Sequence, residues 1–312
     1  METVSQVAQT FSQLHDQVRG FFFGPHHIPE LLSTALLADG HILLEGVPGV
    51  AKTTLVKYFS ALIGCEIRRI QFTPDLMPSD ITGTMIPTPD FSSKNFLPGP
   101  VFTQVLLADE INRAPAKTQA ALLEALEERV VTVEGSSFQL SKPFFVLATQ
   151  NPEESAGTFP LPEATIDRFL LRIKLGYPDQ NQELHMITRH HVNPPMPKPL
   201  LDAAAIINAQ QLVEQVKVTE PLMRYVLSLI RWTRQQPQIE IGASPRAGLA
   251  LIRAVKAYAA LQGRDFGIPD DVKFLAHAVL GHRIRLSYES EMANISVNQL
   301  ISRALDKMEL LA

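Results

Sequence analysis

The sequence contains very little cysteine and no long hydrophobic segment. Cys65 is the only cysteine among 312 residues, which excludes an intrachain disulfide and a multi-cysteine zinc site and fits a reducing cytosol. No apolar run approaches the roughly 18 residues that span a bilayer, and the first residues lack a basic signal-peptide region. We therefore expect a cytoplasmic protein that does not enter the membrane, with Cys65 as a small buried residue.

An excess of charge of either sign is also missing. Lys and Arg number 28 against 32 Asp and Glu, so the net charge is -4, which provides no overall attraction to nucleic acid or to anionic lipid. The 46% hydrophobic and 19% charged fractions are those of folded globular proteins. The length favours two domains rather than one.

Short apolar runs alternate with helical patterns in the first half of the chain. Two helices are predicted first, around residues 7–18 and 28–36. Five strands are then predicted at residues 41–45, 66–72, 105–108, 144–149 and 170–175. This alternation predicts an α/β fold, with a parallel sheet covered by helices and a ligand site beyond the carboxyl ends of the strands.

Two β-hairpins are predicted as insertions into this pattern. The first pairs residues 84–89 with 96–101, and the second pairs residues 130–133 with 137–140. After Gly176, Tyr177 and Pro178 the strand signal stops, and helices are predicted at 179–190, 203–216, 220–235, 244–261, 269–280 and 297–310. We therefore divide the chain into an α/β domain, residues 1–176, and a smaller all-helical domain, residues 177–312. Prolines at 194, 195, 197 and 199 indicate a stiff loop.

The first predicted strand runs into a loop that has the pattern of a phosphate-binding loop. It consists of Gly46, Val47, Pro48, Gly49, Val50, Ala51, Lys52 and Thr53, and Thr54 then continues an apolar helix. In such loops the backbone N–H groups surround phosphates, the lysine reaches the β and γ oxygens, and the hydroxyl of Thr53 binds magnesium. Ala51 replaces a glycine of the general pattern, at a position where a helix begins and a methyl group costs little. The alternative is a Gly-Pro turn before a helix.

Two acids follow the third predicted strand. Asp109 and Glu110 come directly after residues 105–108, which are all apolar. Asp109 would bind magnesium through its water shell, and Glu110 would orient or deprotonate the attacking water. A surface loop after a strand is the alternative.

A third polar group follows the strand at 144–149. The amides of Gln150 and Asn151 could sense a γ-phosphate there, but an Asn-Pro turn with Pro152 explains the same residues.

Taken together, these motifs resemble the MoxR family of AAA+ ATPases. The resemblance rests on residues 46–53, 106–113, 148–152, 161–169 and 243–247, which occur in the family's order, and it covers nearly the whole chain from about residue 20. It implies that Asn151 is the first sensor, that Arg168 is an arginine finger offered to a neighbouring subunit, and that Arg246 is the second sensor in a helical lid. The two hairpins match the family's insertions. Residues 24–27 depart from the family's Val-Gly-Gln-like element near the adenine.

The resemblance also implies cofactors and partners. ATP and Mg²⁺ are the expected cofactors, and a homo-oligomeric ring, a hexamer by analogy, is the expected assembly. The expected activity is ATP hydrolysis that remodels a protein client, and family analogy indicates a partner with a von Willebrand factor A domain.

The two arginines also have interpretations that need no family. Arg168 follows a short predicted helix, where a cation can cap carbonyl groups or pair with Glu163 or Glu154. Arg246 follows Ser244 and Pro245, which have the pattern of a helix start, so its charge opposes the helix dipole and an anionic phosphate would explain its placement.

Two other classes of protein remain as alternatives. A DNA motor would need cations on its hairpins, yet the second hairpin contains none and the first contains only Lys94. A nucleotide-gated scaffold with little turnover is distinguished from a motor only by measuring hydrolysis.

Overall fold

The first half of the chain forms a five-stranded parallel sheet, as predicted. The computed structural model describes residues 1–22, 24–47, 52–90, 92–151, 157–189 and 196–308. The strands lie in the order β2-β5-β8-β1-β9, and every neighbouring pair is parallel. They are β1 (Ile42–Gly46), β2 (Ile67–Gln71), β5 (Val105–Asp109), β8 (Phe145–Gln150) and β9 (Leu171–Leu175). All five predicted strands are therefore present.

Alternate residues of the central strands enter two separate hydrophobic clusters, one on each face of the sheet. In β5, Val105 and Leu107 belong to one cluster, and Leu106 and Ala108 belong to the other. The first face is covered by helix α3 (Lys52–Leu62) and the second by helix α5 (Ala116–Glu128). Because a strand buried on both faces reads as a continuous apolar run, the sequence could not show which residues face which helix.

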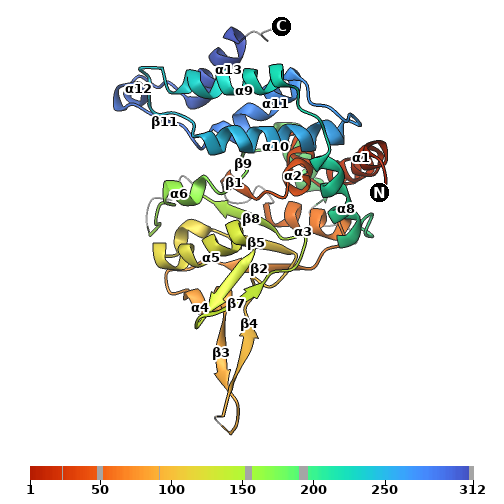
Figure 1. Cartoon of the computed structure of the whole chain (residues 1–312), viewed down its shortest axis with the longest axis vertical. Coiled ribbons are helices and arrows are strands. Elements are labelled where there is room, and N and C mark those ends of the chain that lie inside the picture. The colour runs from red at the N-terminus through yellow and green to blue at the C-terminus, as the bar shows by residue number, and fades with distance from the viewer. Residues whose placement is uncertain (23, 48–51, 91, 152–156, 190–195, 309–312) are drawn as a thin grey trace.

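The second half of the chain forms a layer of helices that also contacts the N-terminal helices (Figure 1). Helices α1 (Val4–Phe21) and α2 (Ile28–Leu37) pack against α10 (Pro245–Leu261), so one hydrophobic cluster continues from the sheet into this layer. The other long helices of this half are α7 (Gln180–Arg189), α8 (Ala203–Glu214), α9 (Glu220–Thr233), α11 (Pro269–Leu280) and α13 (Val297–Lys307). The boundary at residues 176–178 stays a prediction. The predicted proline loop lies partly outside the described residues.

A small β-ribbon in this half was missed. Strands β10 (Ile239–Ile241) and β11 (Arg285–Leu286) pair antiparallel. Strands of two and three residues are too short to produce an alternating pattern, so an all-helical domain was expected. The short helices α4 (Pro78–Thr82) and α12 (Tyr288–Met292) were also missed, because five residues are too few to show helical periodicity, whereas α6 (Glu163–Ile166) is the short helix predicted before Arg168.

Both predicted hairpins are present, and the first is shifted from its prediction. Strand β3 (Gly83–Pro87) pairs with β4 (Lys94–Pro98), so the loop covers residues 88–93 and Lys94 belongs to a strand. Side-chain hydrogen bonds are formed within this loop, among them one from the Thr88 hydroxyl to Asp90 Oδ1 at 2.6 Å. The hairpin projects from the body of the molecule (Figure 1). The second pairs β6 (Val130–Val133) with β7 (Ser136–Gln139).

The two hairpins contact each other through side chains. Phe96 of β4 stacks on Phe138 of β7 with ring centroids 3.9 Å apart. Lys94 of the first hairpin pairs with Glu134 of the second at 2.5 Å.

Cys65 is buried, as predicted, and burial raises the pKa of its thiol to about 11. The described part of the chain contains no helix that could span a lipid bilayer.

Candidate functional site

The predicted phosphate loop begins where β1 ends and finishes where α3 starts. Gly46, Val47, Lys52, Thr53 and Thr54 are described, whereas Pro48, Gly49, Val50 and Ala51 lie outside the described residues. A Cβ atom on Gly46 would lie 2.6 Å from the Leu175 carbonyl oxygen of β9, so only glycine fits there. The strand-loop-helix context that the motif requires is therefore present on both sides of the loop.

The ammonium of Lys52 lies among the groups expected around a nucleotide. It donates to the Gly46 carbonyl oxygen at 2.6 Å. Burial lowers the pKa of Lys52, and the carboxylates of Asp109 and Glu110 act in the opposite direction. The structure thus brings together the lysine of the loop and the two acids that follow β5.

Asp109 ends β5 between its neighbours β2 and β8. Its side chain is largely buried and accepts hydrogen bonds from the Thr149 hydroxyl at 2.5 Å and from Arg69 Nη2 at 2.7 Å. The Thr149 hydroxyl oxygen also accepts from the Glu110 backbone N–H at 2.9 Å. Thr149 therefore fixes both acids relative to β8. No role was predicted for Thr149 or Arg69.

Glu110 has a left-handed backbone, with φ of 56°. This conformation is costly for a residue with a side chain and turns the chain sharply after the buried strand. Its carboxylate accepts from Gln71 Nε2 at 2.7 Å and pairs with Arg113 Nε at 3.1 Å. Gln71 ends β2, opposite Asp109 in the parallel register. A polar residue at the end of a neighbouring strand was the available signal for Gln71, and it was missed.

Asn151 follows β8, so it lies at the same edge of the sheet as Asp109. It is half-buried, and its backbone carbonyl accepts from Asn112 Nδ2 at 3.3 Å. Its neighbour Gln150 donates from Nε2 to Glu45 Oε1 of β1 at 2.6 Å. Pro152 lies outside the described residues. The predicted sensing role of Asn151 remains a prediction.

The groups at this edge suit a magnesium nucleotide. Magnesium prefers hard oxygen ligands, and the Thr53 hydroxyl and the Asp109 carboxylate supply oxygen. Phosphate groups are bound by helix N-termini and by ammonium groups, which α3 and Lys52 supply. The residues therefore fit both Mg²⁺ and a polyphosphate.

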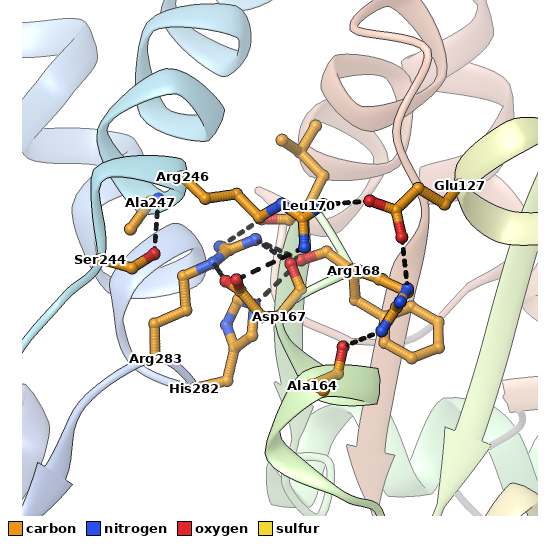
Figure 2. A network of polar contacts seen from close by, with 11 residues as sticks. Glu127, Ala164, Asp167, Arg168, Leu170, Ser244, Arg246, Ala247, His282 and Arg283 are labelled. Carbon is orange, nitrogen blue, oxygen red and sulfur yellow. Dashed lines mark hydrogen bonds and ion pairs between the residues drawn. The ribbon is translucent and has the colours of Figure 1, made fainter. Parts of the chain in front are cut away.

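Arg168 and Arg246 form a separate cluster around Glu127 of α5 (Figure 2). Arg168 Nε donates to Glu127 Oε2 at 2.8 Å, and Arg246 Nη2 donates to Glu127 Oε1. Arg168 also caps the Ala164 carbonyl, as its simpler interpretation expected. Its acidic partner is Glu127 rather than Glu163, and Glu154 lies outside the described residues. Glu127 comes from a distant part of the sequence, so local spacing could not reveal it.

The start of α10 places Arg246 beside this cluster. Ser244 is the N-cap, and its side chain accepts from the Ala247 N–H at 3.3 Å, with Pro245 in the first turn. The predicted helix start is therefore confirmed. The anion beside Arg246 in this chain is the Glu127 carboxylate, with Asp167 Oδ2 at 3.9 Å from Nη1.

Arg283, from the loop after α11, ties the helical layer to the segment that carries Arg168. Its side chain is 3% exposed. It pairs with Asp167 at 2.7 Å and donates to the carbonyls of Phe169 at 2.7 Å and Leu170 at 3.1 Å (Figure 2). The adjacent His282 contacts the Phe169 carbonyl at 3.0 Å. No motif indicated Arg283.

The two groups of residues lie at opposite edges of the sheet. In a parallel sheet all carboxyl ends share one edge, and Lys52, Asp109 and Glu110 lie there. Arg168 lies three positions before the first residue of β9, so it lies at the amino edge. A strand of five residues separates the edges by about 16 Å. Within the described part of the chain, no hydrogen bond or ion pair joins Arg168 or Arg246 to the three carboxyl-edge residues.

Comparisons with known proteins agree with this architecture. Residues 41–171 match the family described as ATPases associated with various cellular activities (AAA), and residues 231–304 match the AAA lid domain. The sheet and the helical layer are thus the two parts of an AAA-type ATPase.

Similar proteins narrow this class further. Chaperone MoxR1 of Mycobacterium tuberculosis is 41% identical over 99% of this chain and 84% of its own length. Protein MoxR of Methylorubrum extorquens is 30% identical, with 88% and 87% covered. A solved structure from Cytophaga hutchinsonii, described provisionally as an ATPase, superimposes with a TM-score of 0.91 at 38% identity, with 99% and 97% covered. The chain belongs to the MoxR family of AAA+ ATPases.

Proposed function

We propose that this chain hydrolyses ATP with Mg²⁺ at sites shared between copies in a homo-oligomeric ring, with a hexamer as the expected size. The observation that supports this most directly is the placement of Arg168 and Arg246 at the amino edge of the sheet, opposite Lys52, Asp109 and Glu110. A side chain of arginine cannot span the sheet to its own site. The same arginines can meet the phosphates bound at the carboxyl edge of a neighbouring copy.

Each residue at the carboxyl edge has a role in this proposal. Lys52 neutralises phosphate oxygens. Thr53 and Asp109 would hold Mg²⁺, which would offset the negative charge that develops on the phosphates. Glu110, aimed by Gln71 and by the Thr149 hydroxyl, orients the attacking water and accepts its proton. Asn151 senses the γ-phosphate at the end of β8.

The size of the expected effect distinguishes this role of Arg168 from a structural one. An arginine finger contributes about 10³ to 10⁵ in rate, or roughly 4 to 7 kcal/mol of transition-state stabilisation. The pair with Glu127 is partly exposed, and such pairs contribute only about 0 to 1 kcal/mol of stability. Loss of the pair alone would leave turnover intact.

A mixing experiment tests the shared site. Arg168→Ala and Glu110→Gln should each be nearly inactive, the first without its finger and the second able to bind ATP but not to hydrolyse it. In a mixed ring, some interfaces combine an intact Glu110 site with an intact Arg168, and these should regain activity. If the two variants co-assemble, as shown by a tag on one of them, and stay inactive, Arg168 does not act on a neighbour's site.

We further propose that hydrolysis remodels a protein client rather than DNA. The hairpins carry one cation within their strands, Lys94, and it is paired with Glu134. One similar protein is named a chaperone. Pull-down with the Glu110→Gln variant, followed by mass spectrometry, tests whether a protein with a von Willebrand factor A domain is the partner. Recovery of DNA instead would favour the DNA motor, and absence of turnover in the wild type would favour a scaffold.

A further inference from the structure

One carboxylate, that of Glu127, binds both arginines of the proposed shared site (Figure 2). Each of its two oxygens accepts from a different guanidinium, Oε2 from Arg168 and Oε1 from Arg246. Burial acts against ionisation, but the hydrogen bonds and charges of the two arginines outweigh it and lower the pKa of Glu127. Glu127 is therefore negatively charged at neutral pH.

A phosphate group would compete with Glu127 for these arginines. Guanidinium groups make their strongest hydrogen bonds to carboxylates and phosphates, and both anions use the same donors. The donors of Arg168 are directed to Glu127 and to the Ala164 carbonyl. Either arginine must therefore release or share Glu127 before it can bind a phosphate fully.

The surroundings of the cluster favour an incoming anion. A cavity of about 380 Å³ opens beside Glu127, Arg168 and Arg246. Its lining includes five arginines and three acids, because Arg129, Arg253 and Arg283 join the two arginines of the cluster while Asp39 and Asp167 join Glu127. The excess of positive charge attracts phosphate, and the cavity gives the arginine side chains room to turn.

We propose that Glu127 is a positioning residue that occupies Arg168 and Arg246 in the separate subunit and releases them to the phosphates of ATP bound by a neighbour. This inference rests on the proposed shared site. Glu127 is 38% exposed, so its ion pairs are weak enough for a nucleotide to displace. Arg168 and Arg246 then bind the phosphates of the neighbour's ATP at the expense of their contacts within this chain. Assembly therefore depends on ATP.

The test measures specific ATPase activity against protein concentration. Glu127→Gln keeps the side-chain length but removes the charge. It should reach half-maximal activity at a concentration about three- to tenfold lower than the wild type, since two weak ion pairs no longer compete. The turnover at saturating protein should not change. Glu127→Asp keeps the charge on a shorter side chain, so it should lower the protein concentration at half-maximal activity less than Glu127→Gln does.

Glu128→Gln is the matched control. Glu128 lies next to Glu127 in α5, is exposed, and makes no hydrogen bond or ion pair within the part of the chain that is described. The substitution causes the same change of charge, so its curve should coincide with that of the wild type. A purely structural role of Glu127 would lower the melting temperature without moving the curve to lower concentration.

The remaining outcomes overturn the inference. If Glu127→Gln matches Glu128→Gln, needs a higher concentration, or turns over more slowly at saturation, Glu127 does not compete with phosphate. If Glu127→Gln gives one of these results while the mixture of Arg168→Ala and Glu110→Gln regains activity, the proposal of a shared site is retained and only the proposed role of Glu127 is wrong. If the co-assembled mixture stays inactive, the shared site is wrong and the role of Glu127 falls with it.

Discussion

Replacing Arg283 with methionine should destabilise the protein and separate the lid from the segment that carries Arg168. The guanidinium is nearly inaccessible to solvent, pairs with Asp167, and donates to the carbonyls of Asp167, Phe169 and Leu170. Removing one member of a buried pair leaves the other charge and its acceptors unsatisfied, which costs about 3 to 5 kcal/mol. The free energy of unfolding of a chain of this size falls by about 3 kcal/mol per molar urea, so the urea concentration at the unfolding midpoint should fall by roughly 1 M or more.

Arg285→Met is the matched control for this prediction. Arg285 lies two residues further along the chain and pairs with Glu163 and Glu240, but it is 47% exposed. Solvent screens these pairs, so its loss should change the midpoint little. Both variants are compared with the wild type by urea unfolding and by ATPase activity. Equal midpoints for the two variants would refute the reasoning, because burial would then not distinguish Arg283 from an exposed arginine.

Three further predictions follow from other residues. Lys52→Ala should abolish ATP binding in calorimetry, and undiminished affinity in the folded variant would contradict its role. Gln71→Ala should lower kcat about tenfold with little change in KM, because Glu110 loses its orienting partner. A large rise in KM alone would contradict this. Burial and Arg19 lower the pKa of His15 from 6.5 to about 4, so stability falls as pH drops below 6.5. Between pH 7.5 and 5 the wild type should lose about 2 kcal/mol more than His15→Gln in urea unfolding.

The grouping of residues at the carboxyl edge of the sheet was largely predictable from local sequence. Apolar runs that end in polar residues identify strands whose carboxyl ends share one edge, and this principle predicts that Lys52, Asp109 and Asn151 lie at the same edge. The orientation of Glu110 was not predictable. It depends on Gln71 and Thr149, which come from two other strands, and strand order is not encoded in any single motif.

The acidic partner of Arg168 and Arg246 could not be predicted from the sequence for a related reason. Glu127 lies 41 positions before Arg168 and 119 before Arg246, at the end of a helix whose apolar pattern gives no special role to that acid. Such contacts arise from packing of the lid against the sheet. The sequence indicated Arg168 and Arg246 through the family's motifs, and it gave no signal for Arg283 or for the shared carboxylate.

Helix α5 connects the two edges of the sheet that would face neighbouring subunits in the proposed ring. It begins shortly after Glu110 at the carboxyl edge of the sheet and ends beside Glu127 at the amino edge, and thirteen residues give it a length of about 20 Å. The hairpin of β6 and β7 follows directly from its far end and leans on the other hairpin through Phe96 and Phe138. In the proposed ring, a tilt of α5 would move Glu110, the arginine cluster and the second hairpin together, and would thereby transmit strain from one subunit interface to the next.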